Sequence, residues 1–255
     1  MPTPPARSPR EATSLTIVLP AYNEAKRIGP ALDELTAWLR GTHRENLPRE
    51  VDVLLVDDGS TDGTADLVER RADPHLRVLR VPHAGKGAAV RAGILHSTSD
   101  LVIFADADMA TPPAELPKLV FALRTADVAL GSRIQPDGSD MRATQPRYRR
   151  MLGGMFHALA SLWVVGEVKD TQCGFKGFTR EAAQGIFSRQ KVTSIVFDVE
   201  LIHLARRLRY KVAIVPIRWE DVRGSRMRPG ARLALRVAWD LFRIPLLHRD
   251  VKQRA

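Results

Sequence analysis

The chain has 255 residues, a hydrophobic content of 44% and a formal net charge of +10 at pH 7. This size and composition suit one globular α/β domain with additions and exclude a chain that is disordered throughout. The single cysteine, Cys173, excludes an internal disulfide and favours a reducing compartment such as the cytosol.

Residues 1–13 precede the first predicted element. They are rich in proline and contain no apolar run, so we expect a disordered lead-in that is neither a signal peptide nor an anchor. Over residues 14–222, short β-branched runs alternate with helical patterns, as in βαβ units, and predict one α/β domain. The predicted strands are Leu15–Leu19, Val51–Val56, Leu76–Val81, Leu101–Ala105, Val128–Gly131 and Val212–Ile217.

Helical patterns fill the spaces between these strands. Leu32, Leu35 and Leu39 recur at helical spacing, and Pro112-Pro113 opens a further helix, because proline is tolerated in a first turn. The other predicted helices in this part of the chain are Thr64–Arg71 and Ala88–His96. Residues 136–146 have the composition of a loop.

The segment Met151–Gly166 contains no charged residue and follows Arg147, Arg149 and Arg150. It is shorter than the roughly 20 residues that span a bilayer. Two interpretations stay open for a helix at about 146–166: a core helix, or a helix that lies among lipid headgroups.

The basic charge is concentrated in two stretches. Residues 223–255 hold nine Lys/Arg and two Asp, 9 − 2 = +7, and residues 133–150 hold five Arg and two Asp, 5 − 2 = +3. Such segments suggest an anionic partner, either lipid headgroups or nucleic acid, although solubilising surface charge is an alternative.

The last predicted helix, Ala231–Leu247, is amphipathic. Charged side chains gather on one face, and the other faces are apolar and include a tryptophan, Trp239. This pattern is typical of a membrane-surface helix or of a helix that docks on a partner. The charged residues are Arg232, Arg236, Asp240 and Arg243. We therefore predict that residues 223–255 form a basic flexible loop followed by a membrane-surface helix.

Polar clusters follow three of the predicted strands at the point where each strand ends. The three sequences are LTIVLPAYNE, VDVLLVDDGSTDGT and LVIFADADMATP, which begin at Leu15, Val51 and Leu101. Ligands of open parallel sheets bind at the carboxyl ends of the strands. The collected carboxylates indicate a phosphate-bearing, metal-bridged ligand and favour an enzyme that uses a nucleotide.

Two of these clusters, and a glycine-rich segment between them, carry specific chemistry. Asp106 and Asp108, two residues apart, suit a hard cation such as Mg²⁺ or Mn²⁺ with a diphosphate. A turn followed by a helix cap does not explain why two aspartates, Asp57 and Asp58, stand side by side. Binding of a base or ribose by one of the two carboxylates would explain it. The Gly85–Gly87 segment lacks the upstream glycine of a P-loop but places Lys86 near a helix start, where an anion is favoured.

The order of the motifs along the chain resembles that of family 2 glycosyltransferases. The motifs are LPAYNE, VDDGSTDGT, GKGAAVRAG, FADADMATP, VALGSR, KDTQCGFKGFTREAA, FDVEL and WEDVRGSR. Within that family the chain is most similar to the dolichyl-phosphate or polyprenyl-phosphate β-glucosyltransferases, from about Leu15 to about Leu247. The resemblance implies a GT-A type α/β fold, a Rossmann-like open sheet flanked by helices, with a C-terminal amphipathic interface helix.

The resemblance also implies roles for individual residues. The nucleotide-binding positions are Pro20, Ala21, Tyr22, Glu24, Asp57, Lys86 and Asp106. The donor-sugar and acceptor positions are Gly131, Ser132, Gln172, Cys173, Gly174, Ser225 and Arg226. The catalytic positions are Asp108 as metal ligand beside Asp106, Arg133 toward the acceptor phosphate, and Asp198 as a base or an orienting group.

The implied reaction is inverting, metal-dependent transfer of a hexose from a nucleoside-diphosphate sugar to a polyprenyl or dolichyl phosphate. Glucose from UDP-glucose is favoured, because Ala110 stands where mannosyl-transferring relatives often carry a glutamine ligand. A cytosolic enzyme with GDP-mannose or another donor and a soluble acceptor is the alternative.

The expected partners are the sugar donor, the lipid acceptor and an anionic membrane surface. An integral membrane partner and a homodimer stay open. No nucleic-acid motif is present, so we expect no nucleic-acid partner. These properties predict a peripheral protein on the cytoplasmic side of the membrane, without a transmembrane helix.

Overall fold

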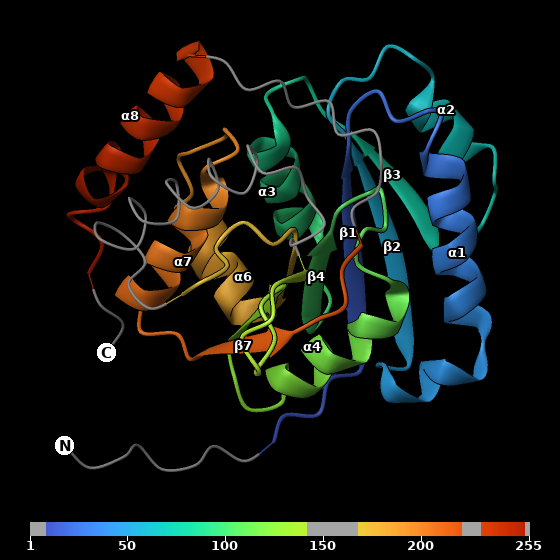
Figure 1. Cartoon of the computed structure of the whole chain (residues 1–255). Coiled ribbons are helices and arrows are strands. Elements are labelled where there is room, and N and C mark those ends of the chain that lie inside the picture. Colours follow the sequence, from blue (N-terminus) through green and yellow to red (C-terminus); the bar gives the residue numbers. More distant parts are fainter. Residues whose placement is uncertain (1–8, 142–167, 221–230, 253–255) are drawn as a thin grey trace.

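The computed structural model describes residues 9–141, 168–220 and 231–252. A seven-stranded sheet lies between two layers of helices (Figure 1), with the strand order β3-β2-β1-β4-β6-β5-β7. This α/β architecture confirms the predicted fold class. The strands are β1 (Ser14–Ala21), β2 (Glu50–Asp57), β3 (Leu76–Arg80), β4 (Leu101–Ala105), β5 (Val128–Ser132), β6 (Phe175–Thr179) and β7 (Val212–Pro216).

The helices cover both faces of the sheet. One face packs on α1 (Ile28–Arg40), α2 (Thr64–Glu69) and α4 (Leu116–Leu123). The other face packs on α3 (Lys86–His96), α6 (Arg180–Phe187) and α7 (Phe197–Arg207). The last helix, α8 (Ala231–Leu247), lies outside α7. Two 3₁₀ turns, Thr42–Asn46 and Pro113–Glu115, complete the described elements.

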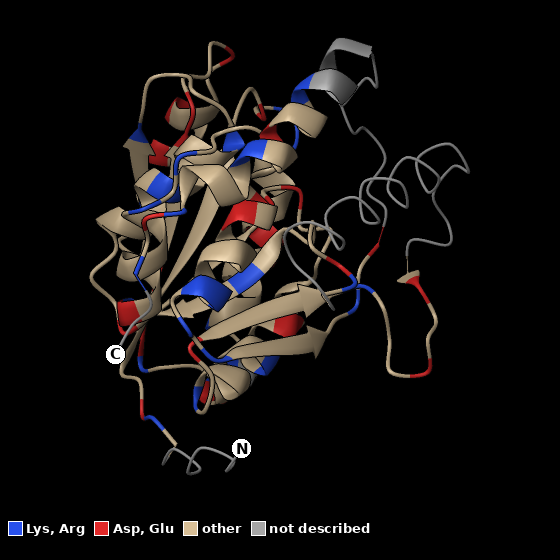
Figure 2. Cartoon of the chain, turned by 90° about the vertical axis from the view of Figure 1, so that its left-hand side faces the viewer, with Lys and Arg blue, Asp and Glu red and all other residues tan. Residues whose placement is uncertain are grey.

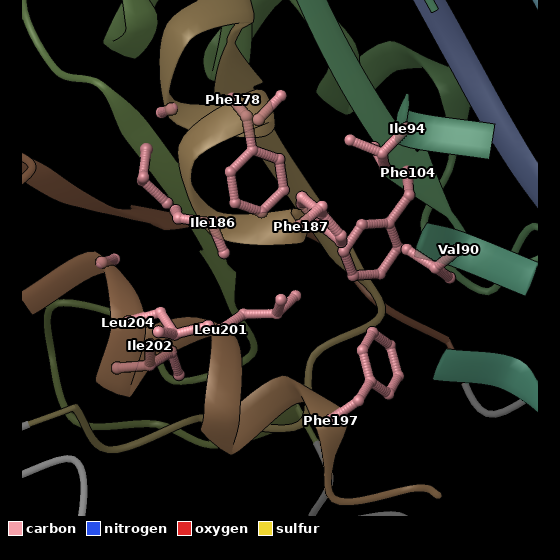
Figure 3. Close-up of a cluster of buried hydrophobic side chains, with 14 of the residues drawn as sticks. Val90, Ile94, Phe104, Phe178, Ile186, Phe187, Phe197, Leu201, Ile202 and Leu204 are labelled. Atoms are coloured by element: carbon pink, nitrogen blue, oxygen red, sulfur yellow. The ribbon is translucent and has the colours of Figure 1, made fainter. Parts of the chain in front are cut away.

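The central strands are apolar along their length because helices bury both of their faces, as in parallel α/β sheets. Phenylalanine rings lie among aliphatic side chains in the core that packs against α6 and α7 (Figure 3). Phe178 meets Phe187 edge to face with ring centroids 5.1 Å apart, and Phe104 lies 5.9 Å from Phe197. This core fixes the start of α7, where Asp198 lies.

The six predicted strands are all present, with ends within two residues of the predicted ones. The structure adds β6, which no pattern predicted, because FKGFT lacks a β-branched apolar run and includes Lys176 and Gly177. Strand β6 pairs antiparallel with β4 and with β5, so the sheet is mixed, although β1 pairs parallel with β2 and with β4. Helices α6 and α7 are likewise additions to the predicted elements.

Part of the predicted lead-in is fixed to the domain. The side chain of Arg10 forms an ion pair with the buried Asp127 at 2.5 Å and donates to the carbonyl of Ala126 at 2.7 Å. Thr13 N donates to Asp100 at 2.9 Å. The expected disorder of residues 1–13 therefore does not hold for residues 9–13.

Helix α8 has the predicted bounds, but one of the residues of its predicted polar face is buried. Leu241 and Ile244 are buried in the core beside α7, at 4% and 0% exposure. Asp240, which we placed with the arginines of the polar face, is 3% exposed and accepts from Ser194 Oγ at 2.6 Å. Asp240 also pairs with Arg243 at 3.0 Å, so it lies with an arginine as predicted, but on the buried side of α8.

Other predictions for the basic segments fall outside the described residues. These are the helix at about 146–166 and the loop that begins at residue 223. Across the described ranges, no helix combines the length and the apolar character needed to cross a membrane.

Candidate active site

The carboxyl ends of β1, β2 and β4 form one edge of the sheet. Ala21 pairs with Asp57, and Val18 pairs with Phe104, so Asp106 follows a strand that runs alongside β1. From β1 the chain builds β2 and β3 on one side and then returns to add β4 on the other side. Ligands of open α/β sheets bind where the strand order reverses in this way. The predicted nucleotide-binding positions thus lie at the expected edge.

The two aspartates after β2, each 3% exposed, have different environments. Asp58 accepts hydrogen bonds from Ala84 N at 2.8 Å and Gly85 N at 3.0 Å, and so fixes the loop before α3. Asp57 Oδ2 accepts from Ser60 N at 3.2 Å, whereas its Oδ1 is buried without a hydrogen-bond partner. Burial of an unpaired carboxylate oxygen is costly, so a ligand N–H or O–H is its expected partner.

The loop after β1 brings an aromatic surface to the same edge. Tyr22 is 43% exposed and stacks on His83, with ring centroids 4.2 Å apart. Asn23, held at a φ of 55°, ties this loop to the loop after β2 through two hydrogen bonds. Both carboxylate oxygens of Glu24 are bound by Arg27, at 2.6 and 2.7 Å. The stacked ring of His83 was not predicted, because nothing but its place before α3 distinguishes it in the sequence.

Lys86 and Asp106 form an ion pair across the site. Burial alone lowers the pKa of Lys86, but the carboxylates of Asp106 and Asp198 more than offset it and the pKa is raised. Gly174 packs directly on the Asp106 carboxylate, since a Cβ at that position would lie 2.1 Å from Oδ2. The loop that contains Gly174 therefore determines where the Asp106 carboxylate lies.

Asp108 lies in a strained turn beside Asp106. Met109, the next residue, has a φ of 51°, and Ala110 N donates to Asp108 Oδ1 at 3.2 Å. Burial, and then the negative charge of Asp106, raise the pKa of the Asp108 carboxyl above its usual range. Negative charge thus accumulates at this point of the edge.

These carboxylates fit a divalent cation as part of its coordination shell. Nowhere in the described ranges do three or more His, Cys, Asp or Glu side chains gather as a metal site. Asp106 and Asp108 supply hard oxygen ligands, which Mg²⁺ and Mn²⁺ prefer, and a cation would relieve the repulsion that raises the pKa of Asp108. The remaining ligands would be diphosphate and water oxygens.

Asp198 lies at the start of α7 and is paired with a buried lysine. Lys176 of β6 is 0% exposed, its Nζ lies 2.5 Å from Asp198 Oδ1, and it also donates to the carbonyl of Cys173. Burial raises the pKa of Asp198, although Lys176 and Lys86 act against this rise. Burial also raises the pKa of the Cys173 thiol to about 12, so this thiol stays protonated at neutral pH. Lys176 was not predicted; its only signal is a lysine within an otherwise apolar strand.

The segment after β5 is held by a second buried ion pair. Asp170 accepts from Arg133 Nε at 2.9 Å and Nη2 at 2.6 Å, and the guanidinium lies 5.5 Å from the ring centroid of Trp219. Burial lowers the pKa of Arg133, but Asp170 more than offsets this and raises it. Gly131 allows β5 to approach β6, since a Cβ would lie 2.7 Å from the Phe175 carbonyl. Arg133 is therefore preorganised rather than free to search for a partner.

The structure gathers most of the predicted nucleotide positions at one edge. Pro20 and Ala21 end β1, and Asp57, Lys86 and Asp106 follow from neighbouring elements. Glu24 lies in the loop that follows β1, where its carboxylate pairs with Arg27 at 2.6 Å. Ser132 is buried, with its Oγ 3.2 Å from the Ile134 carbonyl, and Gln172 is half-buried. Ser225 and Arg226 lie outside the described residues.

Comparison with known proteins identifies the family. The family model described as glycosyl transferase family 2 matches residues 16–187, from β1 through α6. The chain belongs to glycosyltransferase family 2. A family 2 relative from Trichomonas vaginalis, a dolichyl-phosphate β-glucosyltransferase, is 40% identical over 98% of this chain and 75% of its own length. Enzymes of the same name from Drosophila melanogaster and Homo sapiens are 36% and 34% identical, over 94% and 84% of this chain and 77% and 70% of their own lengths.

Solved structures show that this family 2 chain has the GT-A fold. Glucosyl-3-phosphoglycerate synthase from Mycobacterium tuberculosis, in complex with Mn²⁺, UDP-glucose and phosphoglyceric acid, superimposes with a TM-score of 0.63 and 22% identity, covering 92% of this chain and 79% of that one. Staphylococcus aureus TarS with UDP-GlcNAc gives 0.58 and 16%, over 94% and 68% of the two chains.

Proposed function

We propose that this family 2 glycosyltransferase moves glucose from UDP-glucose to a dolichyl or polyprenyl phosphate with inversion at the anomeric carbon. The observation that carries the proposal is the relationship to dolichyl-phosphate β-glucosyltransferases over nearly the whole chain. The orphaned oxygen of Asp57 and the paired carboxylates Asp106 and Asp108 support a nucleoside-diphosphate donor at the sheet edge.

The donor is held by groups from three loops. Asp57 Oδ1 accepts from the base or ribose, and the stacked Tyr22 and His83 offer an aromatic surface beside it. Lys86 faces the diphosphate from the start of α3, where positive charge favours an anion. When bound at Asp106 and Asp108, Mg²⁺ or Mn²⁺ neutralises the charge of the departing nucleoside diphosphate.

The acceptor phosphate is anionic at pH 7 and needs no strong base to become a nucleophile. Arg133, whose Nε and Nη2 are bound to Asp170, is held in place and orients the phosphate by its positive charge. Asp198 is tied to Lys176, so in this proposal it orients the sugar or the acceptor rather than removing a proton. A single in-line displacement at the anomeric carbon then inverts its configuration.

A second candidate is transfer to a small soluble phosphorylated acceptor, with GDP-mannose or another donor. The fold neighbour that binds phosphoglyceric acid favours it. A screen of radiolabelled nucleotide-sugars against a short polyprenyl phosphate and against phosphoglycerate separates the two. We expect label from UDP-glucose in the lipid phase in the presence of Mg²⁺ or Mn²⁺. Label that appears only in the aqueous product, or only from another donor, would overturn the proposal.

We also propose that α8 holds the protein at the cytoplasmic face of an anionic membrane. Trp239, Phe242 and Leu246 recur at helical spacing and are 61%, 50% and 55% exposed, on the helix that buries Leu241 and Ile244 in the core. Figure 2 views the molecule from the side of α8 and shows basic residues along it and near it. Exposed aromatic rings beside basic side chains are typical of helices that lie in the headgroup region.

The double substitution of Trp239 and Phe242 by serine tests this surface. A fully buried ring contributes about 1.5–3 kcal/mol, so we expect affinity for anionic vesicles to fall at least about tenfold. Vesicle sedimentation measures the effect. Phe121→Ser is the matched control, because Phe121 is 71% exposed but lies on α4. Equal losses for both variants, or none for the double variant, would contradict the role of α8.

A further inference from the structure

The loop between α6 and α7 packs against the turn that carries Lys86. Gly87 N donates to the carbonyl of Thr193 at 3.1 Å, and Gln190 Nε2 donates to the carbonyl of Gly87 at 2.9 Å. A Cβ on Gly85 or Gly87 would lie 3.0 or 2.9 Å from the Thr193 oxygen, so no side chain fits between the two segments. The position of this loop therefore sets the backbone position of Lys86.

A buried carboxylate holds that loop in place. Glu200 of α7 accepts from Lys191 N at 2.8 Å and from Val192 N at 2.9 Å. Its third donor comes from the end of the chain: His248 Nε2 lies 2.6 Å from Glu200 Oε1, and both side chains are 0% exposed. Since a carboxylate accepts hydrogen bonds, Nε2 carries the proton in this contact.

Helix α8, which ends just before His248, also contacts the same loop. Asp240 accepts from Ser194 Oγ at 2.6 Å, on the side of α8 that faces the core. Together, these contacts form a continuous connection from the C-terminal helix to Lys86 and its partner Asp106. Every contact in it is a hydrogen bond or ion pair between described residues.

We propose that Glu200 is a positioning residue for Lys86, and that His248 makes α8 part of the support of the donor site. The inference rests on the proposed function, since it takes the ligand near Lys86 to be a nucleoside diphosphate. Without the His248 donor, the buried carboxylate moves toward another donor and carries the loop with it.

Calorimetry with UDP and Mn²⁺ tests the proposal on the full chain. We expect His248→Ala to weaken UDP binding roughly tenfold, the effect of one lost hydrogen bond to a charged group, and to raise the KM for the donor with the acceptor KM unchanged. His248→Gln, which retains an N–H donor, should restore binding. Glu200→Gln keeps the volume of the side chain and is expected to show the same loss should His248→Ala not fold.

Arg207→Ala is the matched control. Arg207 also ties α7 to the end of the chain, through the carbonyls of Val251 and Arg249, but it does not contact the loop beside Lys86. We expect it to lower Tm as His248→Ala does, while UDP affinity and hydrogen exchange of the Gly87 amide stay at the wild-type level. In His248→Ala the exchange of that amide should accelerate.

Two outcomes distinguish the positioning role of Glu200 and His248 from the proposed function. Equal UDP affinity in the His248→Ala and Arg207→Ala proteins would overturn the positioning role of Glu200 and His248. A wild-type protein that does not bind UDP would instead overturn the proposed function.

Discussion

Replacing Asp108 with alanine is expected to leave the protein folded and to lower turnover by several orders of magnitude. The loss follows because Asp108 would hold the cation that neutralises the leaving group. Stability should not fall. The pKa of Asp108 is raised in the folded state, so its ionised form costs stability above that pKa, and the cost disappears as the pH falls through it. Turnover assays and thermal denaturation measure the two effects.

Asp66→Asn is the control for the loss of one carboxylate. Asp66 lies on α2 and pairs on the surface with Arg80, the last residue of β3, and it is not among the residues that hold Asp106 or Asp108. We expect wild-type turnover for this variant. Wild-type activity that persists in excess chelator, or in the Asp108→Ala protein, would contradict metal use at Asp108.

Gly174→Ala is expected to lower turnover by about a hundredfold, the effect of a displacement of about 1 Å in a reacting group. The added Cβ would lie 2.1 to 2.5 Å from the three carboxyl atoms of Asp106, so this carboxylate, which pairs with Lys86, has to move. Steady-state kinetics should show the loss chiefly in kcat, because the groups around Asp57 are untouched.

Gly29→Ala provides the comparison for this substitution. Gly29 lies in α1, and a Cβ there would meet only Arg71 at 3.8 Å, an ordinary contact. Its activity is expected to match that of the wild-type protein. A Gly174→Ala enzyme with wild-type kcat would show that the position of the Asp106 carboxylate does not matter for turnover.

Periodicity located the strands that form the sheet edge because each is buried on both faces and reads as an apolar run. It missed β6 for a physical reason. Lys176 lies inside the protein only because Asp198, on a helix that follows in the chain, supplies the opposite charge. A buried charge of this kind depends on a tertiary partner, which no local pattern reveals.

The roles of residues in the site also depend on tertiary partners that the sequence does not reveal. Adjacent aspartates indicated a ligand after β2, yet the sequence did not separate Asp57, whose Oδ1 is unpaired, from Asp58, which holds backbone amides. The angular pattern of α8 placed Asp240 with arginines, and Arg243 does pair with it, but it did not reveal that Asp240 is buried and also bound by Ser194. In both cases hydrogen-bond partners distant in sequence decided the role.

The antiparallel direction of β6 determines which residues lie beside the site. Strand β5 ends at Ser132 and β6 begins at Phe175, and because the two run in opposite directions both points lie at the same edge of the sheet. The end of β5 is followed directly by Arg133, and Gly174 directly precedes β6, so both residues lie at this edge beside the donor site. Substitutions beside these two strand ends are therefore expected to alter the site without breaking a strand, which makes them a practical place to engineer this enzyme.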